Sequence, residues 1–243
     1  AIGAKCSRPG HNTVYIVGNG LSTDTIPNFA GEKTRAATLF AGLLLNKKGR
    51  AIIPLPGGCA LGERPLERHL DGFRAMGATV TSDDHGIEMT ATDGLHGTTY
   101  RFEKKSHTGT EALIIAATLA KGTTVIENAA LEPEIDDLIE FFCKMGSSIK
   151  RLGDSIVIEG VSKLHGATHH VMPDRNEAVS YATMAIATKG DIIVEGAVQA
   201  HLTSFLAKLD EIGGKYEVAP YGIRFYYDHP LVATDLVTAP EPG

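Results

Sequence analysis

The sequence predicts an α/β fold made of tandem repeats, and the spacing of glycines is the first observation behind it. A glycine that follows an apolar residue recurs as Gly3, Gly77, Gly146 and Gly213, at spacings of 74, 69 and 67 residues. Each of these glycines opens a pair of short strands separated by a turn, and two helix-like segments precede each of the last three. A period of about 70 residues is too long for a small solenoid unit and fits a compact αβ module.

The first helix of each module is small and apolar almost all round. Three segments have this composition, and they begin at Arg35, Glu111 and Glu177. Helices of this kind lie in a protein core. A short strand follows each of them after a glycine, at Gly49, Gly122 and Gly190. Two further segments, 100–102 and 170–172, are candidates for a strand that leads into the buried helix.

The second helix of each module is amphipathic, because its apolar residues recur at intervals of three and four. They are Leu66, Leu70 and Phe73, then Ile135, Leu138, Ile139 and Phe142, then Leu202, Phe205, Leu206 and Leu209. Three such modules would pack their buried helices together and face their sheets outward, which predicts an α/β domain of pseudo-threefold character. The repeat is cut at both ends, so we expect this chain to be a segment of a longer protein.

Composition excludes several classes of function. The 243 residues are 43% hydrophobic and 21% charged, which is typical of a globular protein with a real core, in one large domain or two small ones. The sequence has no apolar run of the roughly 20 residues that span a bilayer and no signal-peptide pattern, so we expect a cytoplasmic protein without a membrane partner. A net charge of −6 excludes the broad basic surface that nucleic-acid binding needs, although a few focused cations can still bind an anionic small molecule.

Cysteine and histidine usage argues against metal and disulfide chemistry. Cys6, Cys59 and Cys143 are odd in number and far apart, which fits a reducing compartment. His165 and the pair His169–His170 fit a polar connection better than a metal site, because no thiol or acid accompanies them at ligand spacing. We therefore predict no metal and no cofactor.

The run Pro54–Pro65 places one of these thiols on a glycine-rich loop. Cys59 follows two glycines and precedes Arg64 by five residues. Glycines let a backbone approach a ligand closely, and a guanidinium both matches phosphate or carboxylate and favours ionisation of a nearby thiol. A lone cysteine is more often an inert small hydrophobe, but this one lies outside any apolar stripe. The loop therefore favours chemistry on an anion.

Four motifs resemble those of the UDP-N-acetylglucosamine 1-carboxyvinyltransferases, the enolpyruvyl transferases that open peptidoglycan synthesis. They are Pro56-Gly-Gly-Cys-Ala-Leu-Gly-Glu-Arg-Pro65, residues 117–135, Pro173-Asp-Arg-Asn-Glu177 and Thr238-Ala-Pro-Glu-Pro-Gly243. The resemblance runs end to end. It implies an inside-out α/β barrel of βαβαββ units, with a first domain over 1–172 and part of a second over 173–243. The related enolpyruvylshikimate phosphate (EPSP) synthases share the repeat but lack the Pro-Gly-Gly-Cys loop, and they are the alternative.

The resemblance also implies a reaction, the transfer of the enolpyruvyl group of phosphoenolpyruvate to the 3-hydroxyl of UDP-N-acetylglucosamine with release of phosphate. Cys59 matches the family's general acid, which fosfomycin attacks. The segment Arg64, Pro65, Leu66, Glu67 and Arg68 matches the positions that grip the nucleotide, and Pro65 and Leu66 also fit a helix start and a core residue. Arg35, 24 residues before Cys59, matches another arginine of the substrate cleft.

Lys104, Lys105, Ser106 and His107 align with the family's loop for uridine and diphosphate, although His107 and Thr108 replace smaller or apolar family residues. Hydroxyls and N–H groups at a helix start bind anions, and an ordinary N-cap is the alternative. Asp174 and Arg175 fall where the family chain crosses between domains, and they either line the cleft or brace the hinge.

Four acidic residues near a helix start, and several family residues that this chain does not contain, bear on the expected activity. The acids Glu132, Glu134, Asp136 and Asp137 open a helix, where the dipole favours them, so we expect a structural role. The family's Lys-Asn pair, the aspartate that serves as base and two arginines are not in this chain, so it is not expected to complete a turnover alone. A catalytically silent paralogue that binds a nucleotide sugar or a partner protein is a further alternative, motivated by the altered loop Ser106–Thr108.

Overall fold

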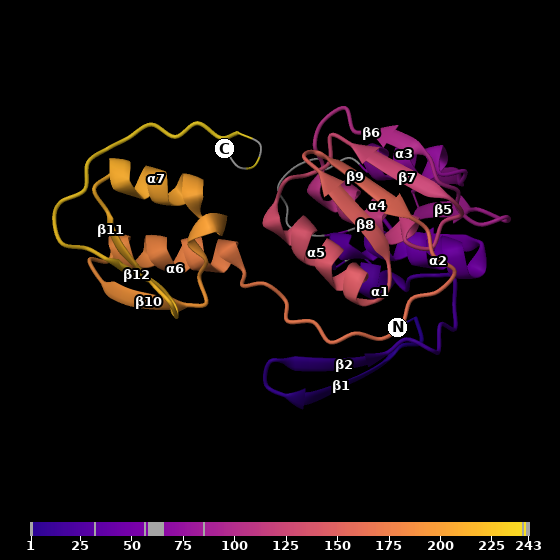
Figure 1. Cartoon of the computed structure of the whole chain (residues 1–243), viewed down its shortest axis with the longest axis horizontal. Coiled ribbons are helices and arrows are strands. Elements are labelled where there is room, and N and C mark those ends of the chain that lie inside the picture. Colours follow the sequence, from indigo (N-terminus) through magenta and orange to yellow (C-terminus); the bar gives the residue numbers. More distant parts are fainter. Residues whose placement is uncertain are drawn as a thin grey trace. The chain divides into compact units, whose positions relative to one another are not determined.

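The computed structural model describes residues 2–31, 33–55, 57, 66–84, 86–239 and 241. It divides into two compact units (Figure 1). The first consists of Ala1–Ala130 and Leu138–Thr168, and the second of Leu131–Asp137 and His169–Gly243.

Helices and strands are interspersed along both units. The first unit holds β1 (Lys5–Gly10), β2 (Thr13–Val17), α1 (Asn28–Gly31), the 3-10 helix η1 (Arg35–Leu39), α2 (Phe40–Lys48), β3 (Arg50–Ile53), α3 (Glu67–Ala75), β4 (Thr79–Asp83), β5 (Gly86–Thr90), β6 (Thr99–Arg101), α4 (His107–Ala117), β7 (Thr123–Glu127), β8 (Ser148–Leu152), β9 (Ser155–Glu159) and most of α5 (Pro133–Lys144). The second holds α6 (Arg175–Ala187), β10 (Asp191–Glu195), the 3-10 helix η2 (Gln199–His201), α7 (Thr203–Glu211), β11 (Lys215–Ala219) and β12 (Gly222–Tyr226).

The same small sheet occurs three times, in the orders β3-β5-β4, β7-β9-β8 and β10-β12-β11. In each copy the strand that comes last in the chain lies in the centre of the sheet. It pairs antiparallel with both of the other strands. Strand β6 adds a parallel edge to the second copy, as predicted for residues 100–102. The repeat inferred from the glycine spacing is therefore confirmed.

The repeated glycine is required by its backbone and by a close neighbour. Its φ is positive in every copy, at +93° for Gly77, +94° for Gly146 and +83° for Gly213. A Cβ at Gly146 would lie 2.9 Å from Nε2 of His165, and one at Gly213 would lie 2.9 Å from Nε2 of His229. Residues other than glycine rarely adopt a positive φ. The turn therefore requires glycine at this position, and this requirement is visible in the sequence.

The core of the first unit lies between α2 and α4. A Cβ on Gly42 would lie 2.6 Å from Cα of Ala116, so the two backbones meet where only a glycine fits. The side chain of Asn46 donates to the Ala116 carbonyl across 2.8 Å. Each helix also packs on the sheet of its own module, which leaves the helices inside and the sheets outside. The predicted burial of these two helices is confirmed.

Helix α6 differs from the prediction of a buried helix. Its face on β10 and β12 is buried through Ala178, Ala182 and Ile186. On its other face Tyr181 is 49% and Met184 51% exposed. Leu206 and Leu209 of α7 belong to the same buried cluster, so α6 is buried within the second unit along one face.

Residues 170–172, a predicted strand, form none. His169 Nε2 lies 3.0 Å from Oδ1 of Asp137, and the Met172 N–H donates to the same oxygen across 3.3 Å. The carboxylate at the start of α5 thus takes a backbone donor that a sheet would have used.

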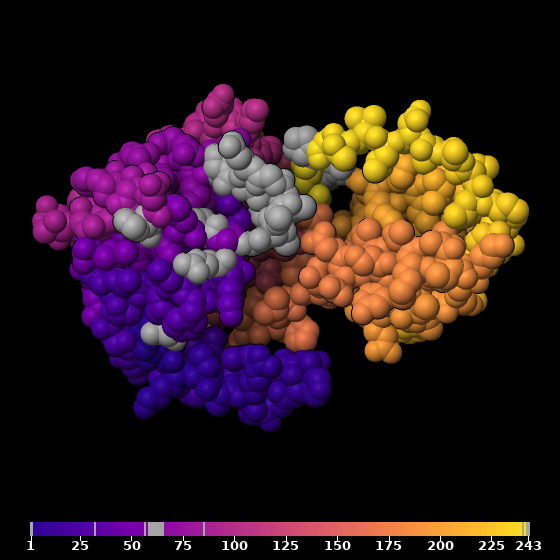
Figure 2. All heavy atoms as spheres, turned by 180° about the vertical axis from the view of Figure 1, so that it is seen from behind, coloured from indigo at the N-terminus to yellow at the C-terminus, as the bar shows by residue number. Residues whose placement is uncertain are grey.

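The hairpin β1–β2 forms the indigo edge of the first unit in Figure 2, with Val14, Tyr15 and Ile16 exposed. None of the helices within the described ranges is long and apolar enough to cross a membrane.

Candidate functional site

The start of α3 holds three of the predicted nucleotide contacts. Leu66 is buried, Glu67 is exposed and Arg68 is half-buried. Leu66 therefore fills the core, as its place on the apolar stripe predicts, while Glu67 supplies a carboxylate to the first turn, where the helix dipole favours it. The backbone is held from outside the helix, since the Tyr100 hydroxyl donates to the Arg68 carbonyl across 3.2 Å. Arg68 is the residue of this group that combines charge with partial burial.

His69, one residue further on, is a candidate site residue that the sequence analysis does not include. It is only 3% exposed, and its Nε2 lies 3.0 Å from Oγ1 of Thr108 at the start of α4. Its Nδ1 is buried and makes no hydrogen bond among the described residues. The available signal was its spacing, because it follows Leu66 by three residues and so shares the buried face of α3.

The environment of His69 keeps its imidazole neutral. Burial is the largest cause of a pKa lowered to about 4, and the positive charge of Arg35 is the next. The Leu66 backbone acts in the opposite direction, and Arg68 lowers the pKa further. A neutral ring carries one N–H, so it donates at one nitrogen and accepts at the other.

Arg35 lies in the same neighbourhood. It is the first residue of η1, and Thr34 caps this 3-10 helix by accepting from the Ala36 N–H across 3.2 Å. The Arg35 carbonyl accepts from the Thr38 hydroxyl across 2.8 Å. Its side chain is half-buried, η1 packs on α4, and its charge acts on His69. The structure therefore brings Arg35 near the starts of both α3 and α4.

The segment that opens α4 is a capped helix start. The Ser106 hydroxyl accepts from the Gly109 N–H across 3.2 Å, which makes Ser106 the N-cap. A Cβ on Gly109 would lie 2.7 Å from that hydroxyl, so the tight cap requires glycine. His107 lies with Nε2 3.8 Å from Oε1 of Glu111, one turn along the helix. Ser106 is an N-cap, and the helix start can still bind an anion, because the uncapped N–H groups of the first turn are available to a ligand.

The two lysines before this helix have different environments. The Lys105 ammonium donates to the Ala129 carbonyl across 3.0 Å and lies 3.4 Å from Oδ2 of Asp154. Lys104 is exposed and makes no ion pair with a described residue. Lys105 therefore serves the fold of the first unit, and Lys104 is the cation available to a ligand.

Cys59, Arg64 and Pro65 lie outside the described residues. The described chain on either side belongs to the first unit, where the Gly57 N–H donates to the Gly31 carbonyl across 3.4 Å. Leu66 is buried at the other end.

Asp174 and Arg175 both stabilise the second unit. The Asp174 carboxylate caps α6 by accepting from the N–H groups of Asn176 and Glu177, at 2.8 and 3.3 Å. The Arg175 guanidinium donates to Glu134 and to Glu241, each across 2.9 Å. Burial lowers the pKa of Arg175, but these hydrogen bonds outweigh it and the pKa is raised. Glu134 thus has the structural role expected from the sequence, with Arg175 as its partner.

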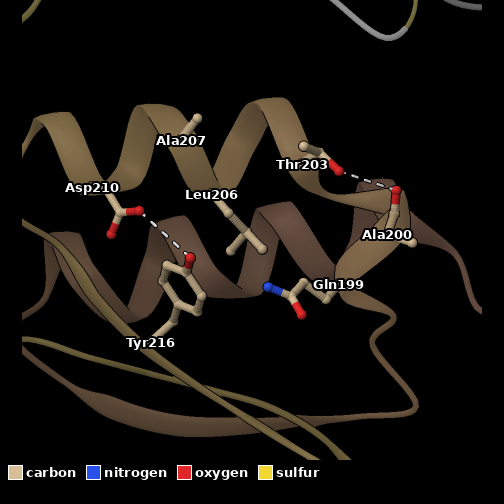
Figure 3. Close-up of a pocket in the computed structure, with 7 residues that line it drawn as sticks. All are labelled: Gln199, Ala200, Thr203, Leu206, Ala207, Asp210 and Tyr216. Atoms are coloured by element: carbon tan, nitrogen blue, oxygen red, sulfur yellow. Dashed lines mark hydrogen bonds between the residues drawn. The ribbon is translucent and has the colours of Figure 1, made fainter.

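A hollow of about 370 Å³ opens on the second unit between α7, η2 and β11 (Figure 3). The Tyr216 hydroxyl donates to Asp210 across 3.5 Å, and Thr203 donates to the Ala200 carbonyl across 3.3 Å. Gln199, Leu206 and Ala207 complete its wall. It contains none of the predicted site residues. Nowhere in the described ranges do three or more His, Cys, Asp or Glu side chains gather as a metal site.

Repeated α/β modules with helices inside and sheets outside define the class of the fold, the inside-out α/β barrel of enolpyruvyl transferases. The enolpyruvyl transferase NikO from Streptomyces tendae aligns with a TM-score of 0.82 at 18% identity, covering 95% of this chain and 56% of that one. An EPSP synthase from Acinetobacter baumannii aligns with a TM-score of 0.67 at 22% identity, covering 93% and 54%.

The chain belongs to the EPSP synthase (3-phosphoshikimate 1-carboxyvinyltransferase) family, whose model matches residues 1–243. UDP-N-acetylglucosamine 1-carboxyvinyltransferase 1 of Staphylococcus aureus, strain MRSA252, is 42% identical over 233 residues, which are 96% of this chain and 55% of that protein. The corresponding protein of strain N315 has the same identity and coverage. The chain thus spans about half the length of these curated relatives.

Proposed function

We propose that the protein carrying this chain transfers the enolpyruvyl group of phosphoenolpyruvate to the 3-hydroxyl of UDP-N-acetylglucosamine and releases phosphate, in the cytoplasm, as the first committed step of peptidoglycan synthesis. The observation that carries the proposal is the 42% identity, over 96% of the chain, to proteins named for this activity. Identity to the EPSP synthase structures is 22%, which favours the sugar nucleotide over shikimate 3-phosphate as acceptor.

The chemistry requires an acid and several cations. Protonation of the methylene carbon of phosphoenolpyruvate lets the sugar hydroxyl add to the neighbouring carbon, as a base takes the hydroxyl proton. A base then removes a proton from the new methyl group, the bond to the phosphate oxygen breaks, and the double bond is restored as phosphate leaves. We assign the proton donation to Cys59, a thiol five residues before Arg64 in the sequence. Thiol and guanidinium would both act on phosphoenolpyruvate, which carries the phosphate and the carboxylate.

The described residues supply the acceptor side of the site. Arg35 and Arg68 are half-buried cations near the start of α3, and Lys104 is an exposed cation before α4. We propose that these three bind the diphosphate and that the first turn of α4, after the Ser106 cap, contributes N–H groups. The neutral His69 adds no charge, so arginine and lysine alone balance the substrate anions. The proposal includes no metal, cofactor or nucleic acid.

Selective labelling tests the role of Cys59. In the protein that carries this chain, fosfomycin should modify Cys59 and leave Cys6 and Cys143 unmodified, although both are exposed thiols and so serve as internal controls. UDP-N-acetylglucosamine should change the rate at Cys59 alone. Peptide mass spectrometry measures all three, and equal labelling of the three thiols would contradict the assignment.

A catalytically silent paralogue is the second candidate, favoured by the altered loop at His107 and Thr108. It predicts that the protein binds UDP-N-acetylglucosamine without releasing phosphate from phosphoenolpyruvate. Calorimetry with the nucleotide together with a phosphate assay separates the two candidates.

A further inference from the structure

The hydrogen bond between His69 and Thr108 joins two segments that are 39 residues apart in the sequence. His69 lies on α3 directly after Leu66–Arg68, and Thr108 lies in the first turn of α4 directly after Ser106 and His107. Both segments are candidate nucleotide contacts. The bond therefore connects the two parts of the first unit that the proposed function assigns to one ligand.

The Thr108 hydroxyl is not needed by its own helix. The N-cap of α4 is Ser106, whose hydroxyl already accepts from the Gly109 N–H. The hydroxyl of Thr108 is thus available for a tertiary contact, and it makes one with His69. One turn further along, a Cβ on Gly72 would lie 2.6 Å from a methyl group of Leu113, so the helices are also in close apolar contact there. The polar bond is at the end of the helix pair that faces the candidate contacts.

The burial of His69 makes this bond costly to lose. The residue is 97% buried, and its other ring nitrogen, Nδ1, already lacks a partner among the described residues. Without the Thr108 hydroxyl, neither ring nitrogen would have a described partner. A buried polar group without a partner is destabilising, so α3 would shift to restore a bond.

We propose that His69 and Thr108 act as a positioning pair that fixes Arg68 relative to the α4 start, so that both segments bind the sugar nucleotide together. The proposal rests on the proposed function for the identity of the ligand. Neither residue need touch the nucleotide. The pair acts through the placement of Arg68 and of the Ser106–His107 backbone.

Substitutions at Thr108 separate the hydroxyl from the shape of the side chain. In the protein that carries this chain, Thr108→Val should raise KM for UDP-N-acetylglucosamine about tenfold, which corresponds to about 1.4 kcal/mol. The value of kcat should fall less than KM rises, because the pair positions groups that bind the ground state and the transition state equally. Thr108→Ser keeps the hydroxyl and should stay within about twofold of the wild type.

Thr118→Val is the matched control. Thr118 lies at the other end of α4, is 1% exposed and donates its hydroxyl to the Ile115 carbonyl across 2.8 Å. The same chemical change there should leave KM within about twofold. An equal rise in KM for Thr108→Val and Thr118→Val would overturn the proposal, because it would show a general effect of loosening α4. An unchanged KM in Thr108→Val would overturn it as well.

A double-mutant cycle and a spectroscopic measurement complete the test. If the two residues act as a pair, the double variant His69→Leu with Thr108→Val should raise KM no more than either single variant does. Additive effects of the two changes on KM would contradict the pairing. Nitrogen-15 NMR of the His69 ring in this chain should show a shift at Nε2 in Thr108→Val and none in Thr118→Val. The NMR result does not depend on turnover, so a protein that releases no phosphate would refute the proposed function while the pair was still tested.

Discussion

Acidification should destabilise the first unit through His69, and the size of the effect follows from its burial. Its folded-state pKa is about 4, against 6.5 for the ordinary side chain, so the unfolded chain binds a proton that the folded chain rejects. The contribution of His69 titration to the free energy of unfolding is therefore fully present above pH 6.5 and is lost as the pH falls toward 4. The whole shift corresponds to about 3 kcal/mol, and about 2 kcal/mol of it should be lost between pH 7.5 and pH 5.

The assay compares the wild type with His69→Gln, which can still bond to Thr108 but does not titrate in this range. Urea denaturation at pH 7.5 and pH 5, followed through NMR amide signals of α3 and α4, gives the free energy of unfolding of the first unit at each pH. Carboxylates affect both proteins equally, so the difference between them isolates His69. His11→Gln changes an exposed histidine and should behave like the wild type. Equal acid destabilisation of wild type and His69→Gln would refute the reasoning.

Three further changes test the packing and capping described above by urea denaturation. Gly42→Ala places a methyl group 2.6 Å from Cα of Ala116 and should destabilise the first unit by about 1–3 kcal/mol. Gly94→Ala, which has open space but a positive φ, should cost only the backbone strain of about 1 kcal/mol. Equal losses of stability in the two variants would contradict the close approach of α2 and α4. Ser106→Ala removes the α4 cap and should cost about 1 kcal/mol, with Ser106→Asp restoring most of it; no loss in the alanine variant would show that the cap is not stabilising. Arg175→Met leaves Glu134 and Glu241 without their shared cation and should destabilise the second unit by about 1–3 kcal/mol. Lys215→Met, at an exposed position of the same unit, should be nearly neutral, and a neutral Arg175→Met would argue against this structural role.

The repeat was predictable from the sequence because its signals are local. A positive φ at Gly77 and Gly146 leaves glycine as the favoured residue, and the stripe Leu66, Leu70 and Phe73 specifies one buried face of α3. The packing of α2 on α4 follows from the same kind of signal, since a helix that is apolar all round needs neighbours on every side.

Predictions that depended on tertiary partners were less successful. The burial of α6 was predicted from composition, but composition does not say whether a partner helix is present, and one face with Tyr181 and Met184 is exposed. Residues 170–172 were predicted as a strand, but the Met172 N–H donates to the Asp137 carboxylate and not to a neighbouring strand. The ligand-binding role of Lys105 stays a prediction, and the bond from its ammonium to the Ala129 carbonyl is invisible in the sequence because the two residues are 24 positions apart.

The same limit explains why His69 was missed. Sequence spacing places it on the buried face of α3, but only the fold shows that Thr108, 39 residues away, is its partner. The hydroxyl that this histidine uses lies in the loop Ser106–Thr108, which the resemblance assigns to the nucleotide.

Phosphate release from phosphoenolpyruvate, measured with each of two acceptors, tests the central claim most directly. The account predicts that the protein carrying this chain releases phosphate with UDP-N-acetylglucosamine, that Cys59→Ala abolishes this release, and that shikimate 3-phosphate gives none. Release with shikimate 3-phosphate alone, or no release with either acceptor, would contradict it.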